Sequence, residues 1–124
     1  MRVPAPTRTE LPGGIVHKIP DQLEYRAAEL GASKLRVEAS VIFQGDHGIQ
    51  SQYVKTKPGD TGGFHKHGWT QVMVVSGAVE VGVEGADPMV VRAGELYFID
   101  AGVPHYETAL EEGVVIVTGQ VAPA

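Results

Sequence analysis

Two histidines separated by a single residue are the first candidates for chemistry in this chain. His65 and His67 lie in the stretch Gly59–Gln71, and on an extended strand side chains two positions apart leave the same face. Gln71 opens an apolar run, and His105 follows a later turn that contains Gly and Pro. Imidazole suits zinc, copper, iron and nickel, and an amide oxygen is a harder donor beside it. These residue types predict a metal site between buried strands.

Length and composition restrict the class of protein. The chain has 124 residues, enough for one hydrophobic core, and 43% of them are hydrophobic, as in globular proteins. It contains no cysteine, which excludes disulfides, iron–sulfur clusters and thiolate zinc sites. The formal net charge of −5 and the lack of a basic patch argue against nucleic acid as a partner. No apolar segment is long enough to cross a bilayer, so we expect a cytoplasmic protein with no membrane partner.

The remaining sequence predicts the elements that must position the histidines. Residues 1–14 are rich in Pro and Gly and predict an irregular N-terminal arm, followed by a single β-barrel domain over residues 15–124. From Ser33 onward apolar and polar residues alternate, and Gly and Pro turns separate the runs. The predicted strands are residues 15–19, 34–41, 49–57, 64–67, 71–76, 78–84, 89–92, 95–99, 104–109 and 114–120. Many short strands predict an all-β sandwich or jelly-roll barrel with mostly antiparallel pairing.

One short helix is predicted ahead of these strands. Asp21 with Glu24 three residues later forms a capping-box pattern. Leu23, Ala27 and Leu30 would share one helical face, and a glycine follows where the helix would end.

Two gapped motifs give the chain a resemblance to the cupin superfamily. The first cupin motif is Gly, five residues, His-x-His, three or four residues, Glu, six residues and Gly. Gly59, His65, His67, Gln71 and Gly77 follow it, with Gln in place of Glu and one residue fewer before the last Gly.

The second motif is Gly, five residues, Pro-x-Gly, two residues, His, three residues and Asn. Gly94, Gly102 and His105 are in register with it, while Asp100 replaces the Pro and Ala109 replaces the Asn.

The resemblance implies a double-stranded β-helix, or jelly-roll, barrel that holds one divalent ion (Mn, Fe, Ni or Zn). The implied ligands are His65, His67, Gln71 and His105. Thr70 is the alternative to Gln71, because Thr70 keeps six residues before the motif glycine. We prefer Gln71, since its longer side chain carries a carbonyl oxygen and is the better donor.

Glu107 is the candidate catalytic residue outside this ligand set. On a regular strand Glu107 shares the face of His105, where it could act as a base or hold an imidazole. A solvated charge at the rim of the barrel is the alternative. Tyr97 is one of several aromatic residues that could line the pocket, although aromatic residues on such strands more often only pack in the hydrophobic core.

The replacement of the motif glutamate by glutamine affects the predicted function. Three imidazoles and an amide leave the charge of a divalent ion uncompensated, which favours an anionic ligand. We therefore expect a metal-dependent enzyme that acts on a small oxygen-rich or anionic molecule by Lewis-acid chemistry, as a lyase, isomerase or decarboxylase. A metal-dependent dioxygenase is the alternative mechanism, and a non-catalytic small-molecule-binding or sensor cupin is the alternative class. The arm and the apolar segment Ile15–Ile19 predict a homodimer formed by strand pairing.

Overall fold

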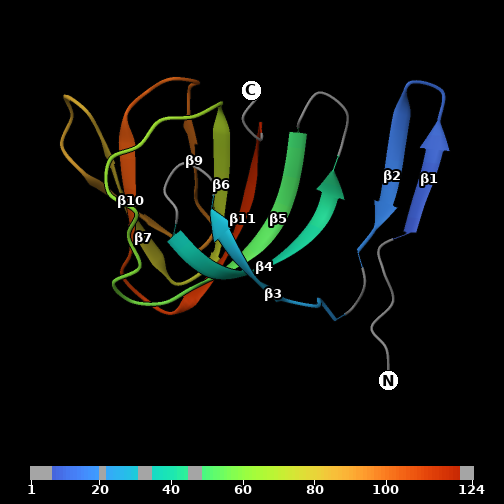
Figure 1. Cartoon of the computed structure of the whole chain (residues 1–124), viewed down its shortest axis with the longest axis horizontal. Helices are drawn as coiled ribbons and strands as arrows, with labels where there is room; N and C mark the ends of the chain where they lie inside the picture. Colours follow the sequence, from blue (N-terminus) through green and yellow to red (C-terminus); the bar gives the residue numbers. More distant parts are fainter. Residues whose placement is uncertain (1–6, 20–21, 31–34, 45–48, 121–124) are drawn as a thin grey trace.

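The described part of the chain forms eleven strands in three sheets (Figure 1). The structure is a computed structural model that describes residues 7–19, 22–30, 35–44 and 49–120. All sheet pairings in these ranges are antiparallel, as predicted. No helix occurs in the described residues, and therefore none that could span a membrane.

Two of the sheets build the barrel. The large sheet has the order β3-β4-β5-β11-β6-β9, and the small sheet has the order β10-β7-β8. The large sheet comprises β3 (Arg26–Leu30), β4 (Leu35–Gln44), β5 (Ile49–Thr56), β6 (Thr70–Ser76), β9 (Leu96–Ile99) and β11 (Gly113–Gln120). The small sheet comprises β7 (Ala78–Val83), β8 (Met89–Arg92) and β10 (His105–Ala109). In Figure 1 the small sheet lies beside the curved large sheet, and this arrangement confirms the predicted all-β jelly-roll barrel.

The interior of the barrel is filled by the alternate residues of both sheets. In β6 the side chains of Thr70, Val72 and Val74 are buried, whereas those of Met73 and Val75 are exposed. The same alternation produces the core, which is mostly small aliphatic side chains. Its buried members are Val37, Ala39, Val54, Val72, Val74, Val79, Val81, Val91, Tyr97, Ile99 and Val115.

The predicted strand over residues 64–67 is wrong. This segment is extended but forms only one bridge, between His65 and His105, inside the long connection from β5 to β6. Gly63 and Gly68 flank the segment and interrupt a regular ladder, so the segment does not pair along its length.

The predicted short helix over residues 21–30 is also wrong. Asp21 lies outside the described residues, and Arg26–Leu30 forms β3 at the edge of the large sheet. β3 pairs with β4 from Arg26↔Ala39 to Leu30↔Leu35. A capping pattern and one apolar face are weak local signals, and pairing with an existing sheet overrides them.

The expected irregular arm contains a strand. β1 (Thr7–Leu11) and β2 (Gly14–Lys18) form a hairpin around Pro12-Gly13, where Gly13 has φ 74°. Pro followed by a residue with positive φ is typical of a tight type II turn, which brings the flanking residues into register. The hairpin is a separate two-stranded sheet that stands away from the barrel in Figure 1. The division into arm and domain, and the homodimer, stay predictions.

Candidate metal centre

Backbone hydrogen bonds fix the two histidine-bearing segments against each other. The N–H of His65 donates to the carbonyl of His105 at 2.8 Å, and the N–H of His105 donates to the carbonyl of His65 at 2.9 Å. The N–H of Gly102 donates to the carbonyl of His67 at 2.8 Å. Gly102 has φ 78°, a conformation that other residues rarely adopt, which explains the glycine in the turn before β10. The loop after β5 is therefore tied to the start of β10.

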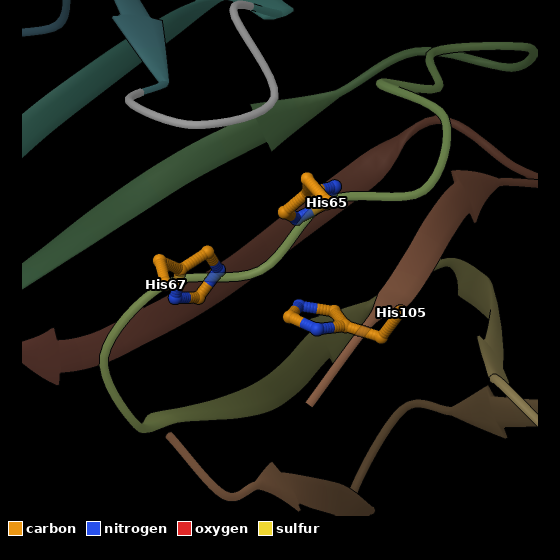
Figure 2. A group of neighbouring side chains, drawn as sticks. All are labelled: His65, His67 and His105. Atoms are coloured by element: carbon orange, nitrogen blue, oxygen red, sulfur yellow. The ribbon is translucent and has the colours of Figure 1, made fainter. Parts of the chain in front are cut away.

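The three imidazole rings converge on one point (Figure 2). Their centroids are 4.5 Å apart for His65 and His105, 4.9 Å for His67 and His105, and 5.3 Å for His65 and His67. One nitrogen from each ring lies within 4.8 Å of the other two. The three-histidine group could therefore bind a metal ion.

Each histidine has its Nδ1 atom occupied by a backbone carbonyl. The acceptors are the carbonyls of Gly63, Gly68 and Val103, at 2.7, 2.6 and 2.8 Å from the Nδ1 atoms of His65, His67 and His105 respectively. A carbonyl oxygen only accepts hydrogen bonds, so each Nδ1 carries a proton. In the neutral ring this leaves the Nε2 lone pair free for a metal. The main chain thus selects the tautomer that ligation requires.

The Nε2 atom of His105 provides a test of whether these residues fit a metal. The side chain of His105 is only 1% exposed, and its Nε2 has no hydrogen-bond partner in the described part of the chain. A buried polar atom without a partner is uncommon and calls for an explanation. A bound cation would supply the missing partner, so the donor set and its environment fit a divalent ion.

Glu107 lies beside the histidine cluster. Its Oε1 is 3.6 Å from Nε2 of His65 and 3.5 Å from Nε2 of His105. Its Oε2 accepts a hydrogen bond from the hydroxyl of Tyr97 on β9, so this contact crosses from the small sheet to the large one. From the sequence, Glu107 is predicted to act as a base or to hold an imidazole, and Tyr97 is predicted only as a possible lining residue of the pocket. Nothing in the sequence indicated that the two side chains meet.

The surroundings of Glu107 shift several pKa values. Burial alone would raise the pKa of Glu107, but the contacts with His105, His65 and Tyr97 outweigh it and lower the pKa from 4.5 to about 2. The contact with Glu107 raises the pKa of His65, whereas burial lowers that of His67. Burial, with the nearby carboxylate, raises the pKa of Tyr97 well above 10. A carboxylate with so low a pKa is ionised at neutral pH. The base role of Glu107 stays a prediction.

Strand alternation places Gln71 and Thr70 on opposite faces of β6, and ligation by either stays a prediction. Thr70 and Val72 face the interior of the barrel with exposed fractions of 5% and 2%. Gln71 lies between them on β6 and therefore points the other way, on the same face as the exposed Met73. Thr70, the alternative for this position, is the residue on the interior face. The six-residue spacing to Gly77 was the signal that favoured it.

A cavity opens beside His65. It has a volume of about 80 Å³, enough for a few waters or a small organic molecule. Most of its lining is aliphatic, and its polar members include Asp60, His65, Tyr97 and Glu107. Any molecule in this cavity would meet His65 and the Tyr97–Glu107 pair.

A small antiparallel jelly roll with inward-facing histidines on two motif segments is the architecture of a cupin. The chain belongs to the cupin family, because the family model described as "Cupin domain" matches residues 52–119. No curated protein matches the chain at a significant level.

Solved structures of other proteins have the same fold. An RmlC-like cupin from Shewanella frigidimarina is 25% identical, with a TM-score of 0.64 over 85% of this chain and 89% of that one. KdgF from Halomonas sp. is 23% identical, with a TM-score of 0.61 over 78% and 87% of the two chains. A predicted oxalate decarboxylase from Thermotoga maritima is 17% identical, with a TM-score of 0.65 over 81% and 94%. At the last two identities the likeness concerns the fold alone.

Proposed function

We propose that this cupin binds one divalent metal ion through His65, His67 and His105 and uses it as a Lewis acid on a small molecule. The observation that carries the proposal is the set of three Nε2 atoms left free by backbone carbonyls, one of them buried without a partner. Mn, Fe, Ni and Zn all suit imidazole donors, so the ligand types do not select among them.

A bound ion in this position would polarise a carbonyl or carboxylate oxygen of the substrate. The chain supplies the rest of the site. The aliphatic lining of the cavity limits water, and its volume of about 80 Å³ limits the substrate to a small molecule. Tyr97 keeps its proton because its pKa is raised, and its hydroxyl donates that proton in a hydrogen bond to Glu107 at the cavity wall.

The reaction class we favour is that of a lyase, isomerase or decarboxylase. A Lewis-acid ion beside a mostly apolar cavity is the arrangement that such reactions need at a carbonyl or carboxylate. The expectation of an anionic substrate rested on a neutral ligand set. Glu107 weakens it, because this carboxylate stands within 3.6 Å of two of the three free nitrogens. The proposed substrate is therefore a small oxygen-bearing molecule, either neutral or anionic.

Metal content tests the binding part of the proposal. We expect the purified chain to hold about one divalent ion per protomer by elemental analysis, and the His105→Ala variant to hold little or none. His17→Ala is the matched control, because His17 lies in β2 of the separate hairpin and should leave the metal content unchanged. Equal metal content in wild type and His105→Ala would refute the site.

Turnover without dioxygen tests the reaction class. Metal-loaded protein would be incubated anaerobically with small hydroxy acids, keto acids and dicarboxylates, and the products followed by NMR against chelated protein. We expect metal-dependent turnover under these conditions. Turnover that requires and consumes dioxygen would instead identify the dioxygenase alternative, and saturable binding without turnover would identify a binding or sensor protein.

A further inference from the structure

The chain lacks a carboxylate where the first cupin motif has one. Thr70 stands six residues before Gly77, on the buried face of β6, and its side chain carries no charge. Gln71, the other candidate, points out of the barrel. The interior end of β6 therefore offers the cluster no negative charge.

A carboxylate reaches the same cluster from a different strand. Glu107 lies two residues after His105 on β10 and leaves the same face of the small sheet. Its Oε1 is 3.6 Å and 3.5 Å from the Nε2 atoms of His65 and His105. These are the two atoms that the carbonyls on the other side of each ring leave free.

The distances are those of atoms that can share one ion. Nitrogen and oxygen ligands lie about 2.1 Å from a bound zinc, so two ligands of one ion are at most about 4.2 Å apart. Both separations from Oε1 fall below this limit, so Oε1 could share an ion with His65 and His105. The group in which every ligand atom lies within 4.8 Å of the others comprises His65, His67 and His105 without Glu107, so ligation by all four residues would bring the carboxylate closer to His67 than it lies here. A carboxylate oxygen is also an accepted ligand for each of the metals that suit the histidines.

Tyr97 orients the carboxylate for this role. Its hydroxyl donates to Oε2 of Glu107, which leaves Oε1 as the oxygen directed at the histidines. Tyr97 is 9% exposed and held in the core on β9, so the orientation is set by the large sheet. Hydrogen bonds of this kind to a metal-binding carboxylate fix its position and its availability.

We propose that Glu107 is the fourth protein ligand of the metal, so that the negative charge of this cupin site comes from β10 instead of β6. The inference rests on the metal binding proposed above and extends it. The site then holds a divalent ion with one carboxylate and three neutral imidazoles, which leaves a net charge of +1. Such a site accepts a neutral carbonyl compound as well as a monoanion.

Cobalt titration of variants tests the assignment. Co²⁺ would be added to metal-free protein and binding followed by visible absorption, which reports the ligand set, and by calorimetry, which gives Kd. We expect Glu107→Gln to raise Kd at least about tenfold and to change the absorption spectrum. Glu80→Gln is the control, because Glu80 also accepts a tyrosine hydrogen bond but lies on the outer face of β7, away from the cluster.

Chemical rescue separates a ligand from a residue that only supports the site. In Glu107→Ala, added formate should restore Co²⁺ affinity and a spectrum close to wild type, because a small carboxylate can enter the space left by the side chain. Formamide should not restore them. His105→Ala should lose Co²⁺ binding and should not respond to formate. Thermal melts of the metal-free variants would establish that each remains folded.

The outcomes distinguish this inference from the function on which it rests. If wild type binds no Co²⁺, the metal-binding function fails and the inference falls with it. If wild type binds and Glu107→Gln binds equally tightly, only the inference fails. Weakened binding in Glu107→Ala that formate does not restore also overturns the ligand role, since the side chain then acts from outside the coordination shell.

Discussion

The two faces of β10 carry the same pair of side-chain types in different surroundings. On the inner face Glu107 accepts a hydrogen bond from Tyr97, and on the outer face Tyr106 donates one to Glu80 at 3.0 Å. Tyr106 and Glu107 are consecutive in the sequence, so strand alternation alone sends them to opposite sides. A shift of one residue along β10 would therefore turn Glu107 away from the histidines and out of the barrel.

The outer pair has the features of a packing arrangement. The ring of Tyr106 covers Gly82 on β7 so closely that a Cβ there would clash with the ring. Phe64 packs edge-on against the same ring at 5.1 Å. The inner pair instead joins the two sheets and borders the cavity and the imidazoles. A hydrogen-bonded tyrosine–glutamate pair therefore does not by itself indicate a functional site. The cavity and the imidazoles around the inner pair do.

The largest difference between the two glutamates should appear in acid. The folded pKa of Glu107 is about 2, below its usual 4.5, so its ionised form adds stability above pH 4.5 that is lost as pH falls towards 2. We expect metal-free wild type to lose about 2 kcal/mol more unfolding free energy across this range than Glu107→Gln. Urea unfolding at a series of pH values measures this, and parallel curves for wild type and Glu107→Gln would contradict the contacts described.

A smaller difference is expected in the unfolding free energy that is lost when each of the two tyrosines is replaced by phenylalanine. Tyr97→Phe removes the donor that Glu107 has in the barrel interior, and a buried group left without its partner costs about 1–3 kcal/mol. Tyr106→Phe keeps the ring over Gly82 and loses only a hydrogen bond at the outer face, so we expect a smaller loss than for Tyr97→Phe. Chemical denaturation of both variants at neutral pH would measure the two losses. Equal losses would remove the distinction between the faces.

The smallest effect is expected in the titration of the histidines. In metal-free protein the pKa of His65 should lie above 6.5, because Glu107 favours its protonated form, and that of His67 below 6.5, because it is buried. The raised pKa of His65 adds stability that is present below pH 6.5 and is lost as pH rises through the folded pKa. Glu107→Gln should lower the midpoint of His65, and Glu80→Gln should not. NMR of the imidazole Cε1–H signals measures this; an unchanged midpoint in Glu107→Gln would show that the carboxylate does not influence His65.

Much of the fold could be predicted because its strands follow local rules. The period-two alternation before Val41 and the Gly and Pro turns after it place β4 to β11 close to where they occur. The helix over residues 21–30 failed because a five-residue segment next to an open sheet edge follows the sheet, whatever its capping pattern. The strand in the arm was missed because prolines mask a hairpin whose turn itself uses Pro12.

The candidate site could be predicted only in part. The histidines carry a spacing signal, and the structure brings all three together. The preference for Gln71 gave donor strength more weight than strand register, and register decides which residue faces inward. The meeting of Tyr97 and Glu107 depends on how two sheets close over each other, which no spacing within one strand encodes.

The paired backbones of His65 and His105 place the proposed ion at a junction between distant parts of the chain. The segment between them, about 40 residues long, contains β6 to β9, and the chain has no cysteine with which to clamp it. An ion bound only by the folded form would therefore be a reversible crosslink between these two segments. Each tenfold rise in free metal above Kd would add about 1.4 kcal/mol to unfolding. The lifetime of the protein against proteolysis would then follow the metal supply of its surroundings.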